Sequence, residues 1–158
     1  MFVLFRAITY ATVFVGFVLI YIPANFLSWS GMEPPASTGW EQVVGMIVGT
    51  IGGGIALWCV LTFAFVGKGT PAPFDPPRRL VIRGPYRFVR NPMYIGAGLA
   101  LAGASLYYQS LPLLGYTGFF FLMAQLFAVL YEEPALRKTF DQEYKDYCAR
   151  TRRWWPKM

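Results

Sequence analysis

The hydrophobic residues of this chain are gathered into long runs, with polar residues collected between them. One apolar run covers residues 7–26 and a second covers residues 43–66. A helix of about 20 apolar residues crosses the hydrocarbon core of a bilayer, so each run predicts a membrane-spanning helix. The polar segment between the two runs holds no Lys or Arg, and Trp29 and Trp40 stand at its edges, as aromatic residues do at a membrane interface.

A third apolar run, residues 93–131, contains no charged residue and is too long for one comfortable span. The polar residues and the proline at residues 109–112 predict a turn in its middle. The run therefore predicts a tight hairpin of two spanning helices, at residues 92–108 and 113–131.

Small residues recur at helical spacing inside these runs. The second run has a glycine at every fourth position, at Gly45, Gly49 and Gly53. The first arm of the hairpin has Gly96, Ala100 and Gly103. Small residues on one face let two membrane helices approach closely, so both faces are expected to be packing surfaces.

The C-terminal segment has the pattern of an amphipathic surface helix. Over residues 132–153, apolar residues recur at helical spacing and basic and acidic residues lie mostly opposite them. We expect a helix that lies along the membrane surface and is anchored after its end by the Trp154-Trp155-Pro156 segment. The apolar positions are Leu136, Phe140, Tyr144, Tyr147 and Cys148.

Composition and charge place the whole chain in the membrane. Of 158 residues, 56% are hydrophobic and only 14% are charged, which predicts one all-α integral membrane domain over residues 1–158. All 14 Lys and Arg residues lie in the N-terminal tip, the loop at residues 67–91 or the C-terminal tail. With four spans these regions share one side, and the positive-inside rule makes that side, with both termini, cytoplasmic. We expect a multi-pass protein of a bacterial inner membrane.

Two absences narrow the chemistry. The chain has no His and only two Cys, Cys59 and Cys148, neither of which is flanked by residues of a metal-ligand type. Most zinc and iron sites, and imidazole acid–base catalysis, are therefore not expected. We expect neither a metal nor a nucleic-acid partner.

The junction between the cytoplasmic loop and the hairpin is the first candidate site. Asn is a favoured helix cap and Pro suits the first helical position, so Asn91 and Pro92 predict a helix start. The free N–H groups of such a start, beside Arg87 and Arg90, suit an anion. The alternative is a capped membrane helix whose arginines face lipid headgroups, as other arginines of this loop are expected to do.

An acid pair at the far end of the hairpin is the second candidate. Glu132 and Glu133 directly follow the charge-free run. They can serve as partners for a ligand cation. They can also be the solvated first-turn charges of the surface helix, a role that Pro134 favours because proline marks a helical start.

The two candidates together carry a resemblance to a known family. The segment Gly84-x-Tyr86-x-x-x-Arg90-Asn91-Pro92-x-Tyr94, placed before a membrane hairpin, resembles the isoprenylcysteine carboxyl methyltransferase and phospholipid N-methyltransferase superfamily. The segment after the hairpin is similar to the C-terminal pattern of the same group. It holds Glu132, Glu133, Leu136, Phe140, Tyr144, Tyr147, Arg152 and Pro156.

This resemblance implies S-adenosylmethionine-dependent methyl transfer to a lipophilic acceptor, which can be a thiol, an amine or a carboxylate. It implies catalytic roles for Arg90, Glu132 and Glu133. The acids would meet the ammonium of the cofactor, and the helix start with Arg90 would meet its carboxylate. The implied cofactor contacts are Leu80, Val81, Tyr86, Asn91, Pro92, Met93, Tyr94 and Glu132.

The chain departs from the superfamily pattern at several positions. Asn91 replaces the usual His, and Pro134 and Asp141 stand where a non-proline residue and Gly are usual. Ala128 stands where the prenylcysteine enzymes have an Arg for the substrate carboxylate, so we do not expect a prenylcysteine acceptor. Two alternatives remain: an NAD(P)H-dependent membrane reductase of the sterol-reductase type, and a non-enzymatic membrane protein that retains the fold.

Overall fold

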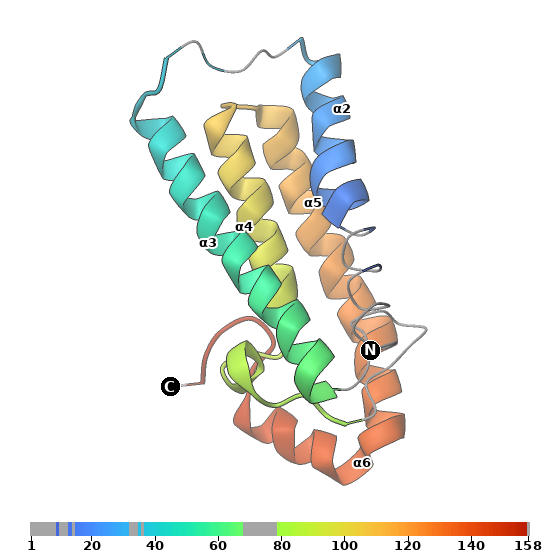
Figure 1. Cartoon of the computed structure of the whole chain (residues 1–158). Coiled ribbons are helices and arrows are strands. Elements are labelled where there is room, and N and C mark those ends of the chain that lie inside the picture. The colour runs from blue at the N-terminus through green and yellow to red at the C-terminus, as the bar shows by residue number, and fades with distance from the viewer. Residues whose placement is uncertain are drawn as a thin grey trace.

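The computed structural model describes residues 15–31, 37–67 and 79–157, together with Thr9, Val13 and Pro35. Most of these residues are helical, and Figure 1 shows the helices side by side in a bundle. In chain order the elements are η1 (Val15–Tyr21), α2 (Ile22–Trp29), α3 (Trp40–Thr62), η2 (Phe63–Gly67), η3 (Gly84–Arg87), α4 (Pro92–Tyr107), α5 (Leu111–Phe127), η4 (Ala128–Glu132) and α6 (Glu133–Arg150).

Among the described residues, two continuous helices are long and apolar enough to cross a membrane. They run over Trp40–Gly67, which is 28 residues, and over Leu111–Arg150. The apolar helix Gly16–Trp29 is shorter, and α4 has 16 residues, a rise of about 24 Å. The predicted all-helical fold is confirmed. The predicted first span, residues 7–26, lies partly outside the described residues.

Helix α4 packs against α3 along the small residues, with one correction to the expected register. A Cβ added at Gly45 would lie 2.7 Å from the Gly103 carbonyl oxygen, and one added at Gly52 would lie 2.5 Å from the Ala100 nitrogen. The predicted Gly53 has nothing within 4 Å. At about 100° per residue, a position seven residues on returns to the same face, whereas one eight residues on does not. Gly52 therefore completes the face.

The C-terminal helix differs from the single surface helix predicted over residues 132–153. It continues from α5 through η4, breaks at Asp141 (φ +30°) and ends at Arg150. After the break it runs beneath the bundle (Figure 1). Positive φ favours glycine, the residue that the superfamily pattern has at this place, so Asp141 is held in a strained conformation.

The apolar face of α6 packs on protein. Tyr144 and Tyr147 are buried against Leu80, with the other predicted apolar positions of the helix around them. The pattern was therefore right about which residues share a face and wrong about its partner. Leu80 belongs to the segment that leads into η3, so α6 and the loop before the hairpin form one unit.

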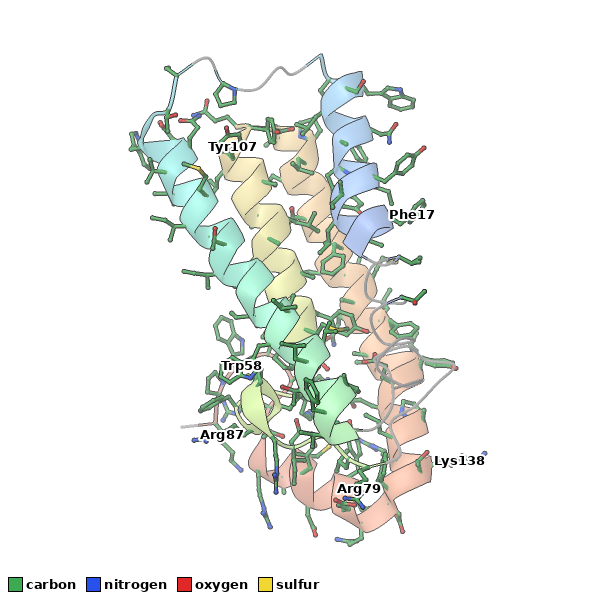
Figure 2. The ribbon with its side chains drawn as sticks, in the orientation of Figure 1. Phe17, Trp58, Arg79, Arg87, Tyr107 and Lys138 are labelled. Atoms are coloured by element: carbon green, nitrogen blue, oxygen red, sulfur yellow. The ribbon has the colours of Figure 1, made fainter. Side chains whose placement is uncertain are left out.

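The described basic residues gather at one end of the bundle. They lie in residues 79–90 and 137–157, the segments that carry η3, α6 and the tail. Figure 2 shows Arg79, Arg87 and Lys138 at this end and Tyr107 at the other. The end formed by the short turn between α4 and α5 has no basic residue among the described ones. We call the first end the basic end.

Candidate active site

The site begins with a hydrogen bond between the two ends of the hairpin. Tyr94 lies in the first turn of α4 and Glu132 is the last residue of η4. The Tyr94 hydroxyl donates to Glu132 Oε1 at 2.7 Å. The structure thus brings together two residues that are 38 positions apart in the sequence.

The two acids lie at the end of η4, a turn of π-helix. Glu133 donates its backbone N–H to the carbonyl of Ala128, five residues back. Such a turn holds one more residue than an α-helical turn and is frequent at functional sites. Consecutive side chains point about 100° apart on a helix, so Glu132 meets Tyr94 while Glu133 points elsewhere.

Glu133 is the centre of an ion-pair cluster. Only 7% of it is exposed. Arg153 binds it as a fork, with Nε 2.5 Å from Oε1 and Nη2 3.0 Å from Oε2. Arg90 Nη1 lies 3.5 Å from the same Oε1 and donates to Cys148 Sγ at 2.8 Å. The predicted catalytic residues Arg90 and Glu133 are therefore brought together, with Arg153 as a third member.

The pKa values of the two acids are shifted in opposite directions. Burial raises the pKa of Glu132, and the charge of Glu133 adds to that rise, against the hydrogen bond from Tyr94. Burial also acts to raise the pKa of Glu133. There the hydrogen bond from Arg153 and the charges of Arg90, Arg153 and Arg137 outweigh it, so the net pKa is lowered.

Asn91 does not cap α4 as predicted. Its side chain makes no capping hydrogen bond, and its Nδ2 is buried without a partner among the described residues. The Arg90 Nε is buried and unpartnered in the same way. The backbone N–H of Asn91 donates to the carbonyl of Arg153 at 3.2 Å, so the tail fixes the backbone here. The Asn91 amide is left free to donate to a ligand.

The loop residues predicted as cofactor contacts are buried in two neighbouring clusters. Val81 and Tyr86 pack with Cys59, and Met93 lies against them. Leu80 faces the opposite way, toward α6. Burial raises the pKa of Tyr86 well above its usual range, and the nearby Cys59 and Glu132 add to the rise.

A pocket of about 460 Å³ lies beside Leu80. It lies between η2, the segment before η3, and α6. Among the described residues no ion pair joins its charged side chains to one another. The lining residues are Phe65, Val66, Arg79, Leu80, Arg83, Phe140 and Glu143.

Sequence reasoning missed the C-terminal tail as part of the site. The predicted membrane anchor Trp154 instead points into the bundle. Its Nε1 donates to Gln125 Oε1 of α5 at 2.7 Å, and its ring meets Phe121 edge-on. The available signal was the amide of Gln125, a polar group inside an otherwise apolar run. Ala128, at the position of the substrate arginine in the prenylcysteine enzymes, is fully buried.

Comparison with known families identifies the class of protein. A family model described as phospholipid methyltransferase matches residues 40–143. The chain belongs to this family of S-adenosylmethionine-dependent methyltransferases. The predicted superfamily, enzyme class and cofactor are confirmed, and the reductase and non-enzymatic alternatives are set aside. No curated protein and no solved structure matches the chain.

Proposed function

We propose that this membrane protein methylates the amine headgroup of a phospholipid at the basic end of the bundle. The observation that carries the proposal is the Tyr94–Glu132 pair beside the unpartnered amide of Asn91. The family match supports a phospholipid as the acceptor.

The residues at the two hairpin ends fit the polar groups of S-adenosylmethionine. The Glu132 carboxylate suits the ammonium of the cofactor. The Asn91 Nδ2 and the N–H groups of Met93 and Tyr94, in the unpaired first turn of α4, suit its carboxylate. The pocket that contains Leu80 and Phe140 is the candidate position for the adenosine.

The spacing along the helix agrees with this placement. From Glu132 to Phe140 the chain is helical, and eight residues rise about 12 Å. One extended nucleoside–amino acid conjugate can therefore reach from the acid to the pocket. Glu143, in the pocket wall, offers a carboxylate to ribose hydroxyls.

When bound, the cofactor would supply a methyl group on a sulfonium: a neutral amine nitrogen would form a bond to the methyl carbon, the carbon–sulfur bond would break, adenosylhomocysteine would leave and the methylated amine would release a proton to solvent. Such a transfer needs neither a metal nor a covalent enzyme intermediate. The protein must then align the two reactants and exclude water. Arg90 and Glu133 contribute by holding the start of α4 against the start of α6. Tyr94 fixes the Glu132 carboxylate through its hydroxyl.

A stacked aromatic pair supports an amine acceptor. The rings of Phe127 and Tyr131 lie 5.3 Å apart at an interplanar angle of 20°, on the exposed side of the hairpin directly before Glu132. Aromatic faces attract ammonium groups, whereas a carboxylate would need a cation. The buried Ala128 supplies none.

Four spans with the basic end in the cytoplasm complete the proposal. The concentration of described Lys and Arg at that end supports this orientation. Trp29 and Trp40 are exposed at the opposite end, where interfacial aromatic residues are expected.

The test is a methyl-transfer assay with the full-length protein in lipid nanodiscs and radiolabelled S-adenosylmethionine. We expect labelled phosphatidylethanolamine, little labelling of a prenylcysteine or a lipophilic thiol, and calorimetric binding of adenosylhomocysteine but not NADPH. Efficient prenylcysteine methylation would refute the amine acceptor. Binding of NADPH alone would refute the cofactor site.

A further inference from the structure

The tail after α6 lies outside the matched family region; it contacts the site at two places and helix α5 at a third. The family match ends at residue 143, whereas the tail covers residues 151–157. The backbone of residues 152–153 runs beside residues 89–91 and forms a parallel bridge between Val89 and Arg152. We call residues 151–157 the tail strap.

The first contact holds the backbone that carries the site. Arg90 donates its N–H to the carbonyl of Arg152 at 2.9 Å, and Asn91 donates to the carbonyl of Arg153 at 3.2 Å. Asn91 has no side-chain cap, so these bonds fix the backbone from which its amide projects.

The second contact joins the tail strap to the acid pair. Arg153 binds both oxygens of Glu133 as a fork, and this geometry fixes direction as well as distance. Glu133 is the neighbour of Glu132 on the same helical turn, so the position of one sets the position of the other. Lysine has a single charged point and cannot reproduce the fork.

The third contact anchors the tail strap in the membrane part of the bundle. Trp154 donates to Gln125 of α5 and packs on the Phe121 ring, which in turn fills the space beside Gly98 of α4. A polar side chain in an apolar span is costly unless it is paired, and Trp154 pairs Gln125. By contrast Trp155, the next residue, is 74% exposed.

We propose that Arg153 and Trp154 are positioning residues for methyl transfer: the tail strap aligns the start of α4 with the acid pair, so that Asn91 and Glu132 face one cofactor. This inference rests on the proposed cofactor site. It assigns the tail a role in cofactor affinity in addition to any role in stability.

The test compares adenosylhomocysteine affinity in four full-length variants, by calorimetry in nanodiscs at a temperature where thermal melts show each protein folded. Trp154→Phe keeps the ring and removes the donor, and Gln125→Met removes the acceptor. Each is expected to weaken binding about three- to tenfold, as one buried hydrogen bond would. Arg153→Lys is expected to weaken binding about tenfold or more. Trp155→Phe is the matched control and should bind like the wild type.

A double variant of Gln125 and Trp154 separates positioning from general damage. If the hydrogen bond is the cause, the double variant binds no more weakly than either single one. Wild-type affinity in Trp154→Phe and Arg153→Lys, with any loss confined to melting temperature, would overturn the positioning role. If the wild type itself does not bind adenosylhomocysteine, the proposed function has failed, which is a distinct result.

Discussion

Neutralising each acid of the pair in turn should separate binding from stability. Glu132→Gln and Glu133→Gln change one charge each, on adjacent residues, with almost no change of volume. We expect Glu132→Gln to stay folded and lose cofactor affinity. We expect Glu133→Gln to lose stability first.

The size of the Glu133 effect follows from its surroundings. Glu133 is buried and pairs with both Arg153 and Arg90. Removing one partner of a buried ion pair costs about 3–5 kcal/mol. Since about a third of the Arg153 side chain is exposed, water compensates part of that loss, and we expect about 2–3 kcal/mol.

Glu132 should behave in the opposite way. A glutamine oxygen can still accept from Tyr94, so the hydrogen bond between the two side chains survives. The fold raises the pKa of Glu132, which means that the fold disfavours its charged form. The free energy of unfolding therefore falls as pH rises and Glu132 ionises. Glu132→Gln removes this penalty and should be at least as stable as the wild type at pH 7. Losing the charge-assisted bond to the cofactor ammonium should cost about 1.5–3 kcal/mol, or one to two decades in affinity.

The assay pairs thermal melts, followed by circular dichroism, with adenosylhomocysteine calorimetry at pH 7. Repeating the melts toward low pH adds a check on the signs. Because the fold lowers the pKa of Glu133, its contribution is present above the ordinary glutamate pKa and is lost on acidification through the lowered value. The deficit of Glu133→Gln should therefore shrink in acid. A Glu133→Gln protein that melts like the wild type, with Glu132→Gln as the unstable one, would refute this division of roles.

Further predictions concern packing, backbone and pH. Gly52→Ala places a methyl group against the α4 backbone and should destabilise the protein by about 1–3 kcal/mol, whereas Gly53→Ala, with open space around it, should not lower the melting temperature. Asp141→Gly should raise stability by about 1 kcal/mol, since relief of strain outweighs the entropy of glycine; a lower melting temperature would argue against the break at this residue. Adenosylhomocysteine affinity should fall as pH drops through the raised pKa of Glu132, and Glu132→Gln should abolish this dependence; a pH profile unchanged by the substitution would place the titrating group elsewhere. Reporter fusions after Gln42 and after Ser110 should both report the side opposite the basic end, and a cytoplasmic signal from either would contradict four spans.

Local patterns were sufficient to predict the helices and that the two ends of the hairpin meet. The charge-free run and its central turn predicted a hairpin, and a hairpin brings its two ends together. That is why Tyr94 and Glu132 could be expected at one place before any contact was known. The apolar spacing in α6 likewise identified the residues that share a buried face.

The remaining features depend on tertiary contacts that no local pattern contains. Asn91 is of a residue type that commonly caps helices, yet the hydrogen bond that fixes its backbone comes from the tail. Trp154 is of a residue type that commonly anchors proteins at the membrane interface, yet its indole N–H donates to Gln125, which is 29 positions away in the sequence. The π-helical turn that ends at the two acids changes the register of the helix by one residue, and nothing in its sequence marks that change.

Photo-crosslinking of radiolabelled S-adenosylmethionine, followed by peptide mapping, tests the central claim most directly. The full-length protein is irradiated in nanodiscs, with excess adenosylhomocysteine as the competitor. Our account predicts competable label in two regions only, the segment from residue 79 to Tyr94 and the segment from Glu132 to Glu143. Competable label at the opposite end of the bundle would contradict a cofactor site held by the two ends of the hairpin. So would label in both regions of Glu132→Gln that equals the label of the wild type under the same conditions.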